Sequence, residues 1–156
     1  MRSKGQPITI LVADDDPDDR EMIVEALRES QLNNPIHCVE DGVELLDYLG
    51  HRGRFAGRGA APRPGLILLD LNMPRMDGRE AIGEIRKSPD LCMIPIIVLT
   101  TSQAEEDIFR TYELGVNSFI TKPVSFEALV AITKTLGRYW FQIVDLPPKP
   151  MMEAAE

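Results

Sequence analysis

The sequence predicts a doubly wound α/β fold, in which a five-stranded parallel sheet carries helices on both faces. Two observations predict this class. Several short apolar runs rich in β-branched residues show no polar alternation, which is typical of strands buried on both sides. Segments with helical period follow these runs, so strand and helix alternate five times along the chain.

The individual elements follow from these patterns in chain order. Strands are predicted at 8–13, 36–39, 66–69, 94–99 and 116–120. The first helix starts at Pro17, and the other four are predicted at 43–49, 79–87, 104–114 and 125–144. A basic segment at 50–65, rich in Arg and Gly, fits neither pattern, and we interpret it as a long solvated loop rather than an RNA contact.

Residues at the predicted helix starts support these boundaries. Asp16 offers an N-cap oxygen, and Pro17 suits the first helical position because its missing N–H has no partner there. Asp18 and Asp19 then lie in the first turn, where the helix dipole favours negative charge, so we interpret both as structural. The run at 102–105 matches a capping box, with Ser102 as the cap of the helix predicted at 104–114.

Composition limits the class of protein. The chain has 156 residues, of which 44% are hydrophobic and 27% charged, which suits one domain with a buried core. A formal net charge of −8 disfavours duplex nucleic acid and suits a divalent cation or a cationic partner surface. Two cysteines form no disulfide framework, and no apolar run is long enough for a membrane span. We therefore expect a cytoplasmic protein that binds neither nucleic acid nor membrane.

Polar side chains gather where the predicted strands end. The first strand ends in Asp14 and Asp15, the third in Asp70, the fourth in Thr100 and the fifth just before Lys122. In an open parallel sheet, ligands bind outside the carboxyl ends of the strands. This edge is therefore the predicted site, and it combines carboxylates, a hydroxyl and an ammonium.

The chemistry of this set points to a metal and a phosphoryl group. Clustered carboxylates repel one another unless a cation joins them, and oxygen ligands without His or Cys select Mg²⁺ or Mn²⁺. The charges of Asp14, Asp15 and Asp70 balance those of Mg²⁺ and Lys122. A carboxylate beside such an ion can also act as a nucleophile and form an aspartyl-phosphate.

From about residue 8 to 144, the chain resembles a response-regulator receiver domain of two-component signalling. Five ordered elements carry the resemblance: Asp14-Asp15, the run 70–78 that starts at Asp70, Thr100, Phe119, and Lys122-Pro123. The resemblance implies a flavodoxin-like receiver fold with strand order 2-1-3-4-5. It also implies a signalling phosphoprotein rather than an enzyme, with only limited autophosphorylation and autodephosphorylation chemistry.

The resemblance assigns the phosphoacceptor and the metal ligands. Asp70 is implied to take a phosphoryl group from a phosphohistidine on a sensor histidine kinase. Asp15 and Asp70 are implied to bind Mg²⁺, or Mn²⁺, together with the backbone carbonyl of Asn72. Asp14 is implied to act on the metal largely through water.

It also assigns the switch residues. Lys122 is implied to pair with Asp70 and then with a phosphoryl oxygen, across a cis Lys122–Pro123 peptide bond. Thr100 is implied to swing towards the phosphoryl group, and Phe119 to repack into the space that Thr100 vacates.

Domain organisation and partners complete the expectations. We expect a receiver domain at 8–144 between short tails at 1–7 and 145–156, without an output domain, that signals by protein contact or phosphorelay. The long loop at 50–65 and the aromatic end at 138–141 resemble those of stand-alone regulators of phytochrome-type photoreceptor kinases. A phosphotransfer or effector protein is a possible partner. A homodimer is possible through the face of the fourth helix, fifth strand and fifth helix, together with the aromatic end of the last helix.

Two other functions stay open from the sequence. A Mg²⁺-dependent phosphohydrolase would use Asp70 as its nucleophile, but such enzymes usually carry a second Asp at the position of Asn72. A receiver-like docking module that is never phosphorylated is the other alternative. Incubation with acetyl phosphate and Mg²⁺ discriminates between the docking module and a phosphoacceptor.

Overall fold

The computed structural model describes residues 8–30, 33–57, 59–143 and 146–147. Its strands are β1 (Thr9–Ala13), β2 (Ile36–Val39), β3 (Pro64–Leu69), β4 (Ile96–Thr100) and β5 (Ser118–Thr121). They form one parallel sheet in the order β2-β1-β3-β4-β5. Both the fold class and the strand order expected from the sequence are confirmed.

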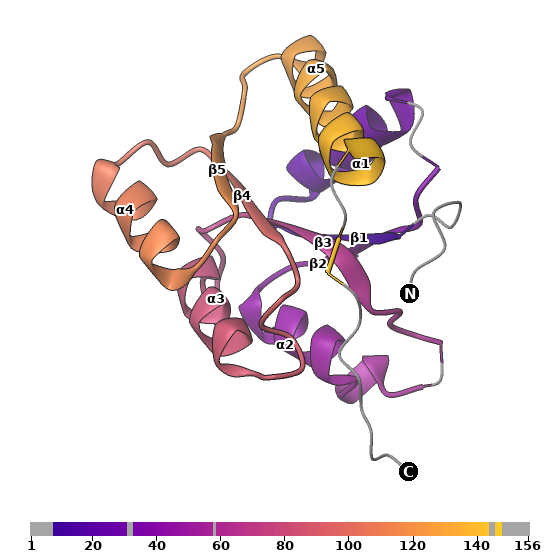
Figure 1. Cartoon of the computed structure of the whole chain (residues 1–156), viewed down its shortest axis with the longest axis vertical. Coiled ribbons are helices and arrows are strands. Elements are labelled where there is room, and N and C mark those ends of the chain that lie inside the picture. Colours follow the sequence, from indigo (N-terminus) through magenta and orange to yellow (C-terminus); the bar gives the residue numbers. More distant parts are fainter. Residues whose placement is uncertain (1–7, 31–32, 58, 144–145, 148–156) are drawn as a thin grey trace.

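Helices cover both faces of this sheet. They are α1 (Pro17–Glu29), α2 (Gly42–Gly50), α3 (Gly78–Lys87), α4 (Glu105–Leu114) and α5 (Phe126–Gly137), with a short 3₁₀ helix η1 (Gly53–Phe55) and a π-helical segment η2 (Arg138–Ile143). Figure 1 shows α1 and α5 together on one face, with α2 and α3 on the other and α4 beside α3. This is the doubly wound arrangement that alternating strands and helices predict.

Alternate residues of the central strands enter two separate cores. Leu11 and Ile67 point into the core under α2 and α3, whereas Ile10 and Leu66 point into the core under α1 and α5. Neighbouring side chains of a strand point to opposite faces of the sheet. Helices cover both faces, so both sets are buried. This explains why these strands show continuous apolar runs rather than polar alternation.

The helix starts agree with the sequence at α1 and differ at α4. Asp16 caps α1, and its carboxylate accepts hydrogen bonds from the backbone N–H groups of Asp18 at 2.9 Å and Asp19 at 3.3 Å. The predicted capping box at 102–105 is wrong, because α4 begins at Glu105 with Ala104 in the N-cap position and no side-chain cap. The Ser102 hydroxyl instead donates to the Asp107 carboxylate at 2.6 Å, so a tertiary contact replaces the local one.

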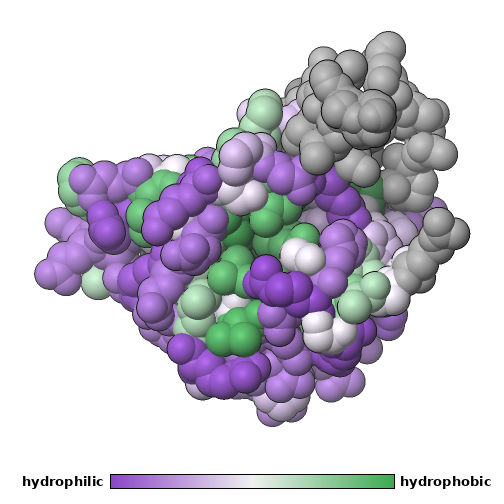
Figure 2. All heavy atoms as spheres, turned by 90° about the horizontal axis from the view of Figure 1, so that it is seen from below, coloured by the Kyte–Doolittle hydropathy of each residue, from purple (hydrophilic) through white to green (hydrophobic). Residues whose placement is uncertain are grey.

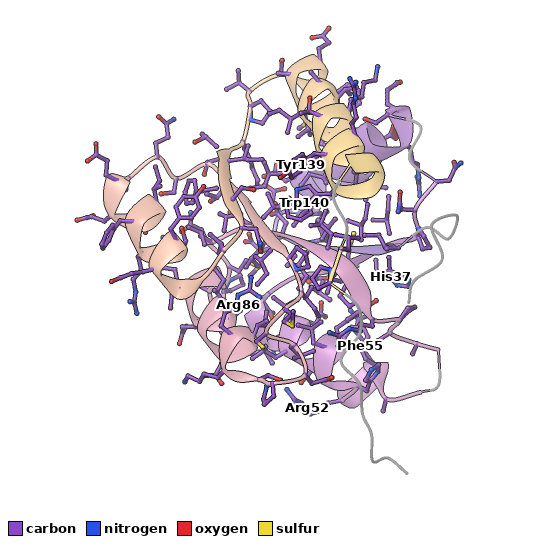
Figure 3. The ribbon with its side chains drawn as sticks, viewed as in Figure 1. His37, Arg52, Phe55, Arg86, Tyr139 and Trp140 are labelled. Atoms are coloured by element: carbon purple, nitrogen blue, oxygen red, sulfur yellow. The ribbon has the colours of Figure 1, made fainter. Side chains whose placement is uncertain are left out.

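The last helix is shorter than predicted. Its α-helical part ends at Gly137, and the wider turns of η2 follow, while residue 144 lies outside the described residues. Trp140 packs against the core under α1 and α5, whereas Tyr139 is half exposed and meets Trp140 edge to face. Figure 3 shows both rings at the end of α5. The side chain of Phe141 lies outside the described part.

The segment at 50–65 is packed rather than wholly solvated, which corrects part of the prediction. Phe55 is buried and lies edge to face with Tyr48 of α2, with ring centroids 5.2 Å apart. Figure 3 shows Phe55 and Arg52 beside α2. Three arginines of the segment pair with acidic side chains: Arg52 with Asp47, Arg54 with Glu44, and Arg63 with Asp90.

Hydrophilic side chains dominate the face seen from below in Figure 2, with hydrophobic side chains gathered around its centre and others towards its left side. Among the described residues, no helix is both long and apolar enough to cross a lipid bilayer.

Candidate functional site: an acidic pocket at the carboxyl ends of the strands

The first two carboxylates of the pocket follow β1. Asp14 is buried, and its backbone N–H donates to the carbonyl of Val39 at 3.1 Å, which continues the ladder between β1 and β2. The Asp14 carboxylate also accepts a hydrogen bond from the backbone N–H of Asp16 at 3.0 Å. Asp15 lies beyond the end of β1 and is exposed. One carboxylate therefore lines the floor of the pocket and the other its rim.

Asp70 follows β3 and lies beside this pair. Its backbone N–H donates to the carbonyl of Ala13 at 2.9 Å, because Ala13 and Leu69 are partners in the parallel ladder. The side chain of Asp70 is buried. One carboxylate oxygen from each of Asp14, Asp15 and Asp70 lies within 4.8 Å of the other two. The structure thus brings together the three carboxylates that the sequence selects.

Lys122 supplies the cation of the pocket from the end of β5. Its Nζ lies 2.7 Å from Asp14 Oδ2 and 3.6 Å from Asp70 Oδ2. The backbone N–H of Lys122 donates to the carbonyl of Thr100 at 2.7 Å, which fixes this residue against the end of β4. Sheet pairing therefore delivers an ammonium to the Asp14 carboxylate, 108 residues away in sequence.

The predicted cis peptide bond is wrong. The described residues contain no cis peptide, so the Lys122–Pro123 bond is trans in this structure. The cis and trans forms of a bond before proline differ by only about 0.5–1 kcal/mol, so a Lys-Pro sequence does not determine the isomer.

Burial and pairing act in opposite directions on these groups. Burial raises the pKa of the Asp14 carboxyl above its usual value, although the hydrogen bond from Lys122 lowers it in part. Burial also disfavours the charged form of Lys122, but hydrogen bonds to Asp14 and Asp19 outweigh it and raise the pKa of the ammonium. Lys122 is therefore charged across the physiological range of pH.

A helix cap and an ion pair hold the loop after Asp70. Asp77 and Glu80 form a reciprocal capping box at the start of α3, which the sequence analysis did not identify. Arg75 adopts a left-handed backbone conformation with φ of 64°. Its guanidinium binds the buried Asp41 carboxylate at 2.8 Å, which ties the loop to the start of α2. Asn72 lies in this loop and is exposed.

The ion pair keeps Asp41 charged. Burial acts to raise the pKa of this carboxyl, but the hydrogen bonds from Arg75 and from the backbone of Glu44 outweigh it and lower the pKa. The pair therefore holds the loop after Asp70 at neutral pH.

The two expected switch residues lie on neighbouring strands, Thr100 on β4 and Phe119 on β5. Thr100 is fully buried, and its hydroxyl accepts a long hydrogen bond from the backbone N–H of Ser102 at 3.5 Å. Phe119 is partly buried and packs against the core under α2 and α3. Its backbone N–H donates to the hydroxyl of Tyr112 on α4 at 3.2 Å.

Asp19 is a member of the pocket that sequence reasoning missed. Its Oδ2 lies 2.8 Å from Lys122 Nζ, as close as that of Asp14 to within 0.1 Å. The interpretation of Asp19 as a partner of the helix dipole was sufficient for the local sequence, so no signal pointed to Lys122. Only the packing of α1 beside the end of β5 reveals the contact.

The donor set fits a hard divalent cation. Asp14, Asp15, Asp19 and Asp70 carry four negative charges against one positive charge on Lys122, leaving −3. One carboxylate oxygen from each of Asp14, Asp15 and Asp70 lies within 4.8 Å of the other two, so these oxygens can approach one small cation together. Carboxylate oxygens without thiol or imidazole suit Mg²⁺ or Mn²⁺ rather than Zn²⁺.

The response regulator receiver domain family matches residues 10–134 of this chain. A regulator of Synechocystis sp., Rcp1, is 38% identical over 141 residues, which cover 90% of this chain and 94% of Rcp1. The chain therefore belongs to the response regulator receiver family, whose members act as phosphoacceptors rather than as conventional enzymes.

Solved structures agree with this assignment. The phosphorylated cyanobacterial phytochrome response regulator RcpA is 40% identical, has a TM-score of 0.85, and covers 92% of this chain and 100% of its own. The Mn²⁺-bound form of Rcp1 is 37% identical with a TM-score of 0.82, over 91% of this chain and 100% of its own.

Proposed function

We propose that this protein is a phosphorylation-controlled switch in which Asp70 accepts a phosphoryl group from a phosphohistidine of a sensor histidine kinase. The observation that carries the proposal is the convergence of Asp14, Asp15 and Lys122 around the buried carboxylate of Asp70. Carboxylates and an ammonium in this arrangement can hold a phosphoryl group by metal and by charge-assisted hydrogen bonds.

The reaction requires little covalent chemistry from the protein. An oxygen of the Asp70 carboxylate attacks phosphorus as the P–N bond of the phosphohistidine breaks, and the departing imidazole nitrogen is protonated from water. The product is an acyl phosphate, which water later hydrolyses to restore the carboxylate and release inorganic phosphate. Positioning of the two reactants and stabilisation of charge supply the catalysis.

Metal binding belongs to this proposal. Asp14, Asp15, Asp70 and the backbone carbonyl of Asn72 are the groups that would hold Mg²⁺ or Mn²⁺, and the relative solved with Mn²⁺ supports the choice. The bound cation would neutralise carboxylate repulsion and the negative charge of the incoming phosphoryl group.

Lys122 and Thr100 complete the phosphoryl site in this proposal. Lys122 would donate to one phosphoryl oxygen and the Thr100 hydroxyl to another, so Thr100 would give up its present contact with Ser102. Phe119 has no hydroxyl, so its response would consist of repacking against the core beside α4. The new contacts would shift the population between two arrangements of β4, β5 and α4.

The proposal also names a class of kinase, a route of output and a cellular location. A phytochrome-type kinase is favoured because the relative RcpA is a phytochrome response regulator. Output through a second copy or an effector is supported by exposed Phe109 and Tyr112 on α4 and half-exposed Tyr139 after α5. We place the receiver unit at 8–144 in the cytoplasm, where Cys38 and Cys92, both free thiols, would stay reduced.

Acetyl phosphate with Mg²⁺ tests the phosphoacceptor. Wild-type protein should gain one hydroxylamine-labile phosphoryl group by mass spectrometry, and Asp70→Asn should gain none. Asp90→Asn, which removes a carboxylate far from the pocket, is the matched control and should behave as wild type. Absence of an adduct from both acetyl phosphate and a phosphorylated kinase would contradict the proposal and favour a docking module.

Light scattering tests the partner. We expect the mass in solution to rise towards that of a dimer when beryllofluoride, a phosphoryl mimic, is added with Mg²⁺. A monomer in both conditions would direct the search to effector proteins instead of a second copy.

A further inference from the structure

Three carboxylates compete for the ammonium of Lys122. Its Nζ lies 2.7 Å from Asp14 Oδ2, 2.8 Å from Asp19 Oδ2 and 3.6 Å from Asp70 Oδ2. The first two distances are those of charge-assisted hydrogen bonds, and the third is outside that range. The phosphoacceptor is therefore the weakest of the three partners in this structure.

The position of the ammonium decides which partners it can bind. An ammonium has three N–H donors and accepts nothing, so each carboxylate that binds it occupies one direction. Asp14 and Asp19 hold two donors, and both acidic residues lie on the side of β1 and α1. The third donor remains for a phosphoryl oxygen on Asp70, but Asp14 and Asp19 hold Nζ 3.6 Å from Asp70 Oδ2, beyond hydrogen-bond distance. Lys122 must therefore shift towards Asp70 to bind a phosphoryl oxygen, and this shift weakens its contact with Asp19.

Asp19 is also the partner that can be exchanged at low cost. Asp14 is buried, with a side chain only 2% exposed, so loss of Lys122 would leave it without a counter-charge. The Asp19 side chain is 31% exposed, so water can solvate it when Lys122 departs. A small cavity between α1 and the start of α5 is lined by Asp19, Lys122 and Pro123 and gives this side chain further room.

We propose that Asp19 is a positioning residue that holds the Lys122 ammonium away from Asp70 in the resting protein. Phosphoryl binding at Asp70 then exchanges the Asp19 carboxylate for a phosphoryl oxygen, while Asp14 keeps its hydrogen bond to Lys122. Asp19 is not a metal ligand in this scheme, and it sets how readily the pocket accepts an anion. The inference rests on the proposed phosphoacceptor function and extends it to regulation of the same site.

Asp19→Asn removes the competing charge, and Asp18→Asn is its matched control. Asp18 lies in the same turn of α1, carries the same charge and, within the described part of the chain, forms no ion pair with Lys122. We expect Asp19→Asn to bind beryllofluoride in the presence of Mg²⁺ about two- to fivefold more tightly than wild type, the range for loss of one partly exposed competing ion pair. Asp18→Asn should match wild type.

Two readouts separate positioning from a general structural effect. The ¹⁵N-edited NMR signal of the Lys122 Nζ should shift in Asp19→Asn and stay in place in Asp18→Asn, because only the first variant changes its hydrogen-bond partners. In a Lys122→Met background, Asp19→Asn should no longer tighten beryllofluoride binding. Thermal unfolding of each variant verifies that the fold is intact.

Manganese alone tests the assignment of Asp19 outside the metal site. Without beryllofluoride, the affinity for Mn²⁺, followed by electron paramagnetic resonance, should change equally in Asp19→Asn and Asp18→Asn. A much larger loss in Asp19→Asn would identify Asp19 as a ligand and overturn the inference.

The outcomes separate the two proposals. If wild type fails to bind beryllofluoride, or if Asp70→Asn binds it equally well, the proposed function fails. If wild type binds beryllofluoride at Asp70 but Asp19→Asn binds it no more tightly than Asp18→Asn, only the role of Asp19 is overturned.

Discussion

Gly78 shows how closely the backbone packs beneath the phosphoacceptor. A Cβ atom at this position would lie 2.5 Å from the carbonyl oxygen of Asp70 and 2.9 Å from the Cα atom of Leu71. Both neighbours are backbone atoms of the segment that places the Asp70 carboxylate. Glycine is needed here because of this close approach.

Gly78→Ala should lower the free energy of unfolding by about 2 kcal/mol, since overpacking of a closed site costs about 1–3 kcal/mol. It should also weaken Mn²⁺ binding, because the shifted loop moves Asp70 out of register with Asp15. Urea denaturation and Mn²⁺ titration measure the two effects. Gly83→Ala is the control: Gly83 lies in the same helix with nothing within 4 Å, and Ala should raise stability by about 0.5–1 kcal/mol.

At the residue scale, the sequence predicts the pocket but not its resting contacts. The rule that strand ends share one edge was sufficient to bring Asp70, Asp14 and Lys122 together. It could not show that Asp19 meets Lys122, because that contact depends on how α1 is rotated relative to the end of β5, 103 residues away.

The loop between β4 and α4 is held by one chain of polar contacts. The Arg79 guanidinium at the start of α3 lies 2.7 Å from the Asp107 carboxylate, and Asp107 accepts the Ser102 hydroxyl at 2.6 Å. Ser102 in turn contacts the Thr100 hydroxyl through its backbone N–H. Hydrogen bonds from Ser102 and Arg79 lower the pKa of the Asp107 carboxyl.

This lowered pKa predicts a dependence of stability on pH. The charged form of Asp107 stabilises the fold above the ordinary carboxyl pKa of 3.8, and the contribution is lost as the pH falls through the lower pKa of the folded state. We expect Asp107→Asn to unfold more easily than wild type by about 1 kcal/mol at pH 7. The difference should shrink below pH 3.8, as urea denaturation at several pH values would measure.

Glu113→Gln is the control for this comparison, because within the described residues the one ion pair of Glu113 is an exposed pair with Arg110 on the same helix. It should change stability by less than about 0.5 kcal/mol at neutral pH. An equal loss in both variants would contradict a specific role of Asp107 in holding the loop.

The segment at 50–65 depends on one aromatic anchor. Phe55 is buried against Tyr48, whose hydroxyl donates to the carbonyl of Pro62 at 2.8 Å. Burial raises the pKa of Tyr48 to about 12, so its hydroxyl stays protonated and donating at neutral pH. The sequence showed Phe55 only as an isolated aromatic among Arg and Gly, and no periodicity reveals burial inside a loop.

Phe55→Ala should release this segment. We expect stability to fall by about 3 kcal/mol, the lower part of the range for a buried Phe, and trypsin to cleave the segment faster under native conditions. Limited proteolysis followed by mass spectrometry locates the cuts. Arg52→Gln, which removes one exposed ion pair, should leave cleavage at the remaining sites unchanged, and faster cutting in both variants would contradict the anchor.

The boundaries of elements were the weakest predictions for a common physical reason. Ser102 has the composition of a capping residue, yet its hydroxyl bonds Asp107 inside the helix, and α4 begins three residues later. The last helix keeps its apolar period beyond Gly137, yet the backbone widens there into η2. Capping residues and apolar periodicity indicate several possible helix ends, and tertiary contacts determine which of them forms.

For the whole molecule, the sheet and its two cores were predictable because continuous apolar strands fit only a doubly covered sheet. Charge is the other property of the whole molecule that bears on its stability. The pocket holds four carboxylates and one ammonium, and the 156 residues of the chain have a formal net charge of −8. Repulsion in the pocket therefore opposes folding until a cation joins the carboxylates.

Divalent cation should accordingly stabilise the whole fold. At a free Mg²⁺ concentration 100 times its Kd, the free energy of unfolding should rise by about 2.7 kcal/mol, or roughly 5–10 °C in Tm. Calorimetry with Mg²⁺ and with EDTA measures the difference. Asp15→Asn should lose most of the Mg²⁺-dependent rise, whereas Asp90→Asn should keep it, and an undiminished rise in Asp15→Asn would contradict the site.

The backbone bonds that join the strand ends have a consequence for how this protein can change. Asp70 is tied to Ala13 and Lys122 to Thr100 by main-chain hydrogen bonds of 2.9 and 2.7 Å, so the pocket continues the sheet lattice with its interstrand repeat of about 4.8 Å. Main-chain hydrogen bonds therefore set the spacing between the strand ends that carry Asp70 and Lys122. Substitution of the side chains at these strand ends can therefore change the chemistry of the pocket while the backbone positions stay the same.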